Sequence, residues 1–464
     1  MMVSSSSSII TGRVSTTFRN KTIIRSPIHP AILMVLFWVL ICSVYLLGPI
    51  YLTPEVSFTT IMFLALHILF FILGSTIFSR IIFFKSLYSK TKQLSYIPKP
   101  YIYHLIFIVL SIGLFGGVMS IYSKLSALND INFSSITQLR TLRAQGLLHG
   151  ESMQGGYLSA LAFLTYPAGF VGVVATIICY EKIPHISRIM SFLFVMIIAI
   201  LAICAGGRSP IMVLFLFIGT SCYTRSKMGK SYIPKSLPLR LAIISLLILF
   251  VVYSSFIWTI RTKEAGLSIN GILSHAANVW GAHPKEYLLK TSEWLDYPGF
   301  TQTVLSTTFY FIQSLSISER LLSSSDIIPT LYGAYQVDLF AAMLRIVPGG
   351  SEFLKDAYEI LLNVNVYGFF TGAWSGLFID LRWGSFLAAL IWGYFAGKSW
   401  LNFKRNPNVL TGITYIFWTY SIFISFVSSP FGFSNSFMIF FWFVLFSLTS
   451  VIFTRYTRIN NFEP

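Results

Sequence analysis

Long apolar runs recur along almost the whole chain, and clusters of Lys and Arg separate many of them. Most runs are long enough to cross the hydrocarbon layer of a bilayer, which takes roughly 20 helical residues. The continuously apolar stretch at residues 31–52 excludes barrel strands, which alternate apolar and polar residues. The pattern predicts an all-α polytopic integral membrane protein. The predicted transmembrane helices, about ten in number, cover residues 31–52, 58–79, 101–123, 157–180, 189–206, 209–224, 241–260, 376–397, 409–428 and 435–453.

Composition supports the bilayer as the solvent of this chain. Hydrophobic residues make up 55% of the sequence and charged residues only 11%, whereas an ordinary soluble domain carries about 25% charged residues. The net charge of +17 could indicate a nucleic-acid partner. Because the basic residues gather beside the apolar runs, however, they indicate topology, and we expect no nucleic acid. No metal cluster or disulfide framework is expected, since the cysteines lie in or at the ends of apolar runs: Cys42, Cys179, Cys204 and Cys222.

The basic clusters fall in the amino-terminal tail and then in every second connection between predicted spans, so they all lie on one side of the membrane. Because basic residues gather on the cytoplasmic side, both termini are predicted to be cytoplasmic. The chain then divides into three parts. Residues 1–260 hold the first seven helices and a small outer loop at residues 124–156. Residues 261–372 form one large outer, periplasmic loop, and residues 373–464 hold the last three helices and a short tail.

The composition of the large loop is that of a folded, water-facing segment, since it carries most of the acidic residues of the chain. Two apolar stretches inside it, Thr303–Ile317 and Leu339–Val347, are too short or too amphipathic to span a bilayer comfortably. We expect both to be helices that lie on the membrane face.

Two arginines at the predicted outer membrane surface are candidate catalytic residues. Arg208 lies in the sequence Gly206-Gly207-Arg208-Ser209-Pro210, between two short apolar runs, and Arg261 follows the seventh span. A charge at this depth is costly unless it binds a partner, and a guanidinium group can hold phosphate oxygens in a bidentate manner. The alternative is that Arg208 reaches out to water from a tight turn and that Arg261 is an ordinary interfacial anchor.

Other polar residues of the two outer loops are candidates for substrate binding. Arg140 and Arg143 would share one face of a helix and could extend a basic groove, or they could simply be solvated. The large loop offers side chains that could hold sugar hydroxyls or move a proton, although a surface role is the alternative for each. These side chains are His283, Glu319, Asp338 and Arg345.

Asp380 and Arg382 lie at the outer end of the eighth predicted span. Opposite charges at membrane depth usually need a partner, so we expect a structural ion pair, between these two residues or with a neighbouring helix, in preference to a direct role in substrate binding.

Two of these segments resemble a known family. The Gly-Gly-Arg-Ser-Pro sequence around Arg208 is similar to the Gly-x-Arg-Ser turn of the oligosaccharide repeat unit polymerases, the Wzy-type O-antigen polymerases. Residues 371–384, followed by a span ending at Gly397, resemble the loop-to-helix segment in which an aromatic-x-Asp-x-x-Gly pattern opens the next span. This chain has Phe378 and Ile379 before Asp380, so the tyrosine that the family often carries here is absent.

The resemblance implies a glycosyltransferase of the bacterial inner membrane. Such an enzyme joins undecaprenyl-diphosphate-linked oligosaccharide repeat units into O-antigen or a related surface polysaccharide on the periplasmic face, as part of lipopolysaccharide biosynthesis. It needs no cofactor, and a flippase and a chain-length regulator are the expected partners besides membrane lipid. One alternative is an O-antigen ligase, which uses the same lipid donor. Another is a polysaccharide flippase or secondary transporter, although transporters usually have two related halves with short loops.

Overall fold

The computed structural model describes most of the chain, and it is helical apart from one small sheet and the connecting turns. In the sheet, β1 (Ile50–Leu52) pairs antiparallel with β2 (Ala282–Pro284), and Tyr51 faces His283. The described residues are 26–79, 100–126, 157–204, 209–234, 273–294, 299–366, 370–433 and 435–459, together with the single positions 240, 244 and 248.

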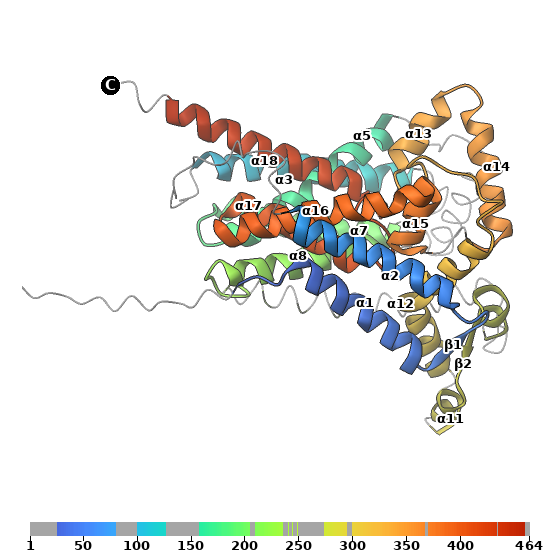
Figure 1. Ribbon diagram of the computed structural model, residues 1–464. Coiled ribbons are helices and arrows are strands. Elements are labelled where there is room, and N and C mark those ends of the chain that lie inside the picture. Colours follow the sequence, from blue (N-terminus) through green and yellow to red (C-terminus); the bar gives the residue numbers. More distant parts are fainter. Residues whose placement is uncertain are drawn as a thin grey trace, which may run out of the picture.

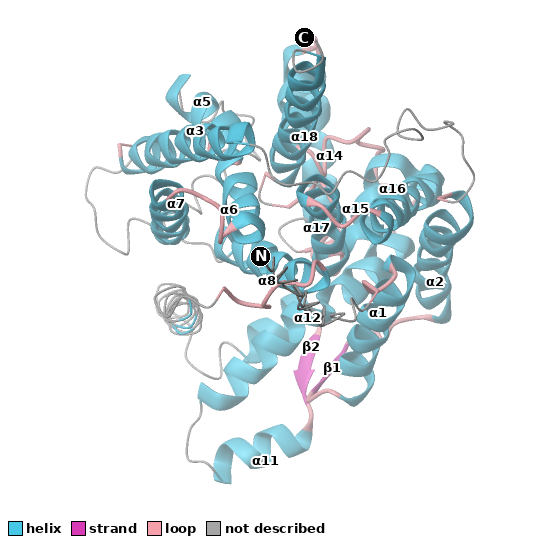
Figure 2. Ribbon diagram, turned by 90° about the vertical axis from the view of Figure 1, so that its left-hand side faces the viewer, coloured by secondary structure: helices cyan, strands magenta, loops and turns pink. Residues whose placement is uncertain are grey.

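A bundle of helices forms the body of the molecule (Figures 1 and 2). Helices occupy the predicted spans within the described residues, whereas the span predicted over residues 241–260 lies almost wholly outside them. The bundle comprises α1 (Pro30–Leu47), α2 (Phe58–Leu73) continued by η1 (Gly74–Phe78), α3 (Pro100–Leu125), α5 (Tyr157–Thr165), α6 (Ala168–Cys179), α7 (His185–Cys204), α8 (Ser209–Lys227), α15 (Gly372–Leu381), η3 (Arg382–Gly384), α16 (Ser385–Arg405), α17 (Val409–Ile424) and α18 (Ser436–Ile459).

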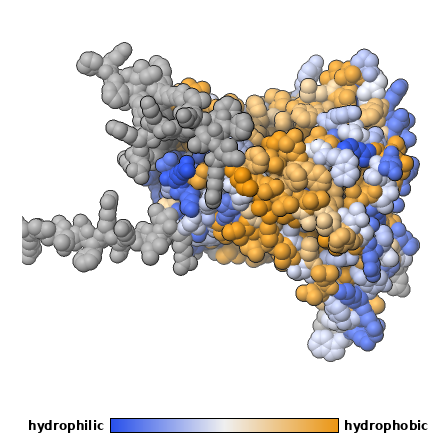
Figure 3. All heavy atoms as spheres, in the orientation of Figure 1, coloured by the Kyte–Doolittle hydropathy of each residue, from blue (hydrophilic) through white to orange (hydrophobic). Residues whose placement is uncertain are grey.

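The surface of the bundle is that of a membrane protein. Among the described residues, seven helical segments are long and apolar enough to cross a bilayer. On the face in view, Figure 3 shows a broad apolar belt across the middle of the molecule, with polar residues on either side of it. Large apolar side chains of the helices, such as Leu36, Leu47 and Ile61, are exposed. The chain is therefore a multi-pass, all-α membrane protein.

Most of the large loop folds into a helical cap at one end of the bundle (Figure 1). The start of α1 and the end of α18 lie at the opposite end, so the cap is on the far side of the apolar belt from both. The helical cap consists of η2 (Ala276–Trp280), β2, α11 (Glu286–Trp294), α12 (Gly299–Ser323), α13 (Asp338–Ile346) and α14 (Gly350–Asn363).

The second half of the stretch Thr303–Ile317 is not the membrane-face helix predicted for it. Residues 312–318 are buried without interruption, so this part of α12 has no face open to lipid. The Ser318 hydroxyl contacts the bundle, since the Ser318 and Ser375 Oγ atoms lie 2.6 Å apart. The first half keeps an exposed face, on which Phe311 is 41% exposed. The predicted helix over Leu339–Val347 corresponds to α13.

Glycines bring α2 and α16 into close contact. A β-carbon at Gly393 would lie 2.1 Å from the carbonyl oxygen of Phe71, and one at Gly397 would lie 2.2 Å from that of Ser75. Gly393 and Gly397 are four residues apart and share one face of α16, the small-xxx-small spacing that lets membrane helices approach closely. Only glycine fits at either position without moving a backbone.

The eighth predicted span, residues 376–397, is wrong as a single helix. The indole rings of Trp374 and Trp392 lie 5.2 Å apart, whereas a continuous helix would separate these residues by about 27 Å. The chain folds back at Arg382, where φ is 51° and ψ is −132°. Helix α15 and helix α16 thus form a hairpin with Arg382–Gly384 at its apex, and α16 is the spanning helix.

Candidate functional site

The apex of this hairpin is enclosed by a turn from the helical cap. The Leu331 N–H donates to the Ile379 carbonyl oxygen at 3.1 Å, and the Tyr332 N–H donates to the Asp380 carbonyl oxygen at 3.0 Å. Residues 330–337 therefore satisfy carbonyl groups at the end of α15, which would otherwise lack partners. We call residues 330–337 the cap turn.

Asp380 fixes the other half of the cap turn. Its carboxylate accepts hydrogen bonds from the backbone N–H groups of Tyr335, at 2.9 Å, and Gln336, at 3.0 Å. Only 1% of Asp380 is exposed, and a buried carboxylate is stabilised by such charge-assisted hydrogen bonds. Asp380 thus joins the helical cap to the bundle.

The ion pair expected between Asp380 and Arg382 is wrong. The ion pairs within the described residues are Arg225–Glu181 and Lys290–Glu286. Asp380 turns to the backbone of the cap turn instead, because two N–H groups there need an acceptor. Arg382 has a different partner: its Nε–H donates to the Thr330 Oγ1 atom at 3.3 Å.

Arg382 occupies an unusual position at the hairpin apex. Its φ of 51° lies in the left-handed region that L side chains rarely adopt. The guanidinium carbon lies 5.5 Å from the centroid of the Phe378 ring, within the range of a cation–π interaction. The next residue, Trp383, is 69% exposed. The strained backbone thus presents a partly exposed arginine beside an exposed indole.

Gln336 connects the cap turn to the α17–α18 connection. Its Oε1 atom accepts hydrogen bonds from Ser428 Oγ, at 3.0 Å, and from the Ser429 N–H, at 3.2 Å. Glycines make room for this side chain: a β-carbon at Gly376 would lie 1.7 Å from Gln336 Nε2, and one at Gly432 would lie 2.1 Å from Oε1. The cap turn is therefore held on two sides: Asp380 links it to α15, and Gln336 links it to the α17–α18 connection.

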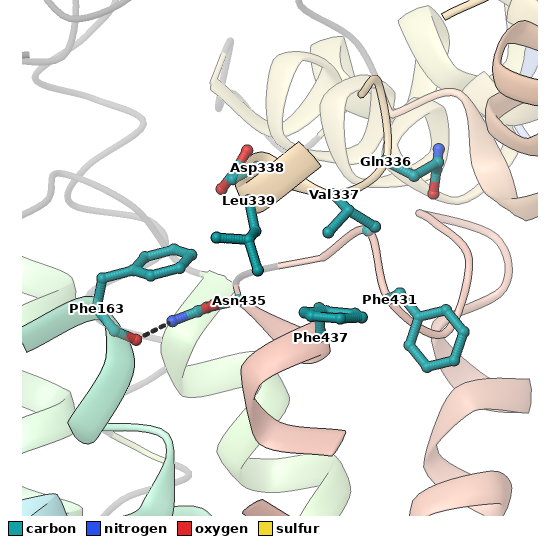
Figure 4. Close-up of a pocket in the computed structure, with 9 residues that line it drawn as sticks. Phe163, Gln336, Val337, Asp338, Leu339, Phe431, Asn435 and Phe437 are labelled. Atoms are coloured by element: carbon teal, nitrogen blue, oxygen red, sulfur yellow. Dashed lines mark hydrogen bonds between the residues drawn. The ribbon is translucent and has the colours of Figure 1, made fainter. Parts of the chain in front are cut away.

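A pocket lies beside this turn (Figure 4). Asn435 closes one side, since its Nδ2 atom donates to the Phe163 carbonyl oxygen at 2.7 Å. Phenyl rings and aliphatic side chains line the pocket together with carboxylate and amide groups. The lining residues are Phe163, Gln336, Val337, Asp338, Leu339, Phe431, Gly432, Asn435 and Phe437.

His283 and Glu319, two of the residues expected to bind substrate, have local structural contacts. The His283 ring stacks on Tyr51 across the β1–β2 sheet, with centroids 5.0 Å apart. Glu319 Oε2 accepts hydrogen bonds from the Ser57 N–H, at 2.8 Å, and from Thr60 Oγ1, at 2.7 Å, at the start of α2. Burial raises the pKa of Glu319, but the hydrogen bonds from Thr60 and Ser57 outweigh this effect and leave the pKa below its ordinary value.

Asp338 and Arg345 lie at the two ends of α13, and Asp338 lines the pocket. Helix α13 and strand β2 lie on opposite sides of the helical cap (Figure 1). The structure therefore does not bring Asp338 and Arg345 together with His283 into one site.

The remaining candidates lie outside the described residues. These are the two arginines expected to be catalytic and the two of the small outer loop: Arg208, Arg261, Arg140 and Arg143. Their roles stay predictions.

Sequence reasoning missed Gln336, Thr330 and Asn435, which belong to the cap turn or the pocket. The polar stretch at residues 428–435 between two apolar runs was a usable signal for the α17–α18 connection. No local pattern marks Gln336, because its partners lie about ninety positions further along the chain.

Comparison with known protein families, with characterised proteins and with solved structures finds no match for this chain.

Proposed function

We propose that the chain is a glycosyltransferase that joins undecaprenyl-diphosphate-linked oligosaccharide repeat units into O-antigen or a related surface polysaccharide. The observation that carries the proposal is the hairpin apex at Arg382–Gly384. The segment that resembles the polymerases, residues 371–384, forms this apex and is held by the cap turn, where a membrane-bound donor and a water-soluble sugar chain can meet.

The proposed reaction needs an apolar environment for the lipid and a water-facing one for the sugars, and both are available near the hairpin apex. A hydroxyl group of the incoming repeat unit forms a bond to the anomeric carbon of the growing chain. The bond from that carbon to the diphosphate breaks, undecaprenyl diphosphate leaves with the electron pair, and the hydroxyl proton passes to solvent or to a base. The apolar belt accommodates the lipid tail, while the helical cap offers polar groups to the sugars. Guanidinium groups stabilise the charge that develops on the leaving diphosphate.

Within this proposal, Arg208 and Arg261 hold the diphosphate of the donor. Loss of one hydrogen-bond donor to a developing anion typically slows a reaction by about 100-fold to 1,000-fold. Arg208→Lys and Arg261→Ala should each shorten the polysaccharide to one or two repeats while the protein still inserts at a normal level. Polysaccharide of normal length in both variants would refute this role.

The helical cap lies on the opposite side of the apolar belt from the start of α1 and the end of α18, which supports a cap on the periplasmic face of the inner membrane and cytoplasmic termini. A single large cap without a counterpart elsewhere among the described residues favours a polymerase or ligase over a transporter with two related halves.

Deletion of the gene, followed by electrophoresis of the surface polysaccharide, tests the proposal. Loss of a polymerase leaves single repeat units attached to the lipid A core, whereas loss of a ligase leaves none. We expect single repeats in the deletion strain and a full ladder after complementation. A long ladder in the deletion strain would exclude the polymerase.

A further inference from the structure

The guanidinium group of Arg382 is held in a way that leaves its outer edge available. Nε donates to Thr330 Oγ1, and the Phe378 ring lies under the guanidinium carbon. Within the described part of the chain, the terminal Nη1 and Nη2 atoms make no hydrogen bond and no ion pair. This edge carries the paired donors that match the oxygens of a phosphate group.

Arg320 shows the contrast within the same helical cap. Its Nη1 atom donates to the carbonyl oxygens of Val279, at 3.1 Å, and Asn365, at 3.3 Å. Burial lowers the pKa of both Arg320 and Arg382, so the contrast between them lies in their hydrogen bonds. Arg320 therefore joins segments of the cap, whereas Arg382 joins none through its terminal nitrogen atoms.

The backbone at Arg382 adds an independent observation. L residues rarely adopt a φ of 51°, and such strained conformations cluster at functional sites. Glycine would adopt this conformation freely, yet the chain carries arginine at the apex and glycine two positions later. An arginine that only anchored the protein in the interface would not require this position.

The surroundings suit the headgroup of a lipid. Exposed aromatic residues are typical of the membrane–water interface, and Trp383 is 69% and Tyr332 74% exposed. Trp383 follows Arg382 directly in the chain, and Tyr332 lies two positions after Thr330. Burial lowers the pKa of Arg382, and the exposed carboxylate of Asp326 partly offsets this effect without forming an ion pair with Arg382.

From these observations we infer that Arg382 is a binding residue for the diphosphate group of a polyprenyl-diphosphate-linked substrate. The inference rests on the proposed function and adds a residue that the sequence pattern had placed in a structural pair. Thr330 is a positioning residue, because it orients the guanidinium group through Nε.

Binding of farnesyl diphosphate to the purified full-length protein in nanodiscs, measured by isothermal titration calorimetry, tests the inference. Loss of charge-assisted hydrogen bonds should weaken binding by about tenfold to a hundredfold in Arg382→Ala and Arg382→Gly. Arg382→Lys should lose nearly as much, because an ammonium group lacks the planar pair of donors that matches two oxygens of one phosphate while Nε is held by Thr330. Thr330→Val should show an intermediate loss, and Lys355→Ala, which removes an exposed cation of the same cap, should bind normally.

Arg382→Gly separates binding from folding. Since glycine relieves the strain at the apex, this variant should melt at the same temperature as the wild type or higher while it loses binding. Normal binding by Arg382→Gly, or no binding by the wild type, would overturn the inference, as would loss of binding only in variants that unfold. Equal affinity of the wild type for inorganic diphosphate would overturn the assignment to a lipid-linked ligand. The gene-deletion ladder tests the polymerase independently of all these results.

Discussion

The Trp374 and Trp392 rings lie 5.2 Å apart in the centre of the bundle, and this contact shows that the eighth apolar run contains a hairpin. Trp374 also lies 5.4 Å from the His67 ring of α2 and 6.1 Å from Trp38 of α1. Helix α15 therefore begins deep among the spanning helices and runs toward the helical cap. Arg382 lies at the apex because the chain reverses there.

Close packing of α2 against α16 should depend on Gly393. A methyl group at this position would meet the Phe71 carbonyl oxygen, and such overpacking typically costs about 1 to 3 kcal/mol. Gly393→Ala should lower the melting temperature of the detergent-solubilised protein. Gly219→Ala is the matched control, because a β-carbon at Gly219 meets nothing within 4 Å. Equal melting temperatures for the two variants would contradict the close contact.

Asp380 should be indispensable to the cap turn irrespective of Arg382. Asp380→Asn replaces one of two carboxylate acceptors by an NH₂ group and leaves a buried backbone N–H unpaired, at a cost of about 1 to 3 kcal/mol. Exchange of the two residues, Asp380→Arg with Arg382→Asp, should not restore stability, because the partners of Asp380 are backbone groups. Asp326→Asn serves as the exposed control in thermal melting. A wild-type melting temperature of the exchanged protein would support an ion pair between the two residues.

Glu319 should contribute to the acid sensitivity of the cap. Its pKa lies below the ordinary value of about 4.3, so its stabilising effect is fully present above that value and is lost as the pH falls through the lower folded-state pKa. The melting temperature of Glu319→Gln should therefore change less below about pH 4 than that of the wild type. Glu359→Gln, on the exposed surface of α14, should keep the wild-type profile. Parallel profiles for Glu319→Gln and the wild type would argue against this contribution.

Cysteine labelling tests the orientation in the membrane. On a background without native cysteines, Ser324→Cys in the helical cap should react with an impermeant thiol reagent in cells with a permeabilised outer membrane. Ser231→Cys, which follows α8 at the opposite end, should react only after lysis. The reverse pattern would invert the proposed topology.

The sequence was sufficient for the membrane class and for most helices, because hydropathy over about 20 residues records the burial of a spanning segment. It was insufficient at the α15–α16 hairpin, where one apolar run contains a helix reversal. The buried second half of α12 was predicted to lie on the membrane face for a related reason. Apolar residues that face protein and apolar residues that face lipid look alike in a sequence.

At the candidate site, the charged residues could be found but not their partners. Asp380 and Arg382 were identified as a costly pair of charges, yet the acceptor role of Asp380 depends on a turn about forty-five positions earlier in the chain. Gln336 was missed because the two glycines that accommodate it come from distant parts of the chain, Gly376 from α15 and Gly432 from the α17–α18 connection. Contacts of this kind depend on tertiary structure.

Reconstitution tests whether the protein itself joins lipid-linked repeat units. The purified protein in liposomes is incubated with a synthetic repeat unit carried on undecaprenyl diphosphate, and the products are separated by size. We expect a ladder of oligomers with release of undecaprenyl diphosphate, one molecule for each new linkage. Unchanged single repeats, with no undecaprenyl diphosphate released by a protein that is folded and correctly oriented, would contradict this expectation.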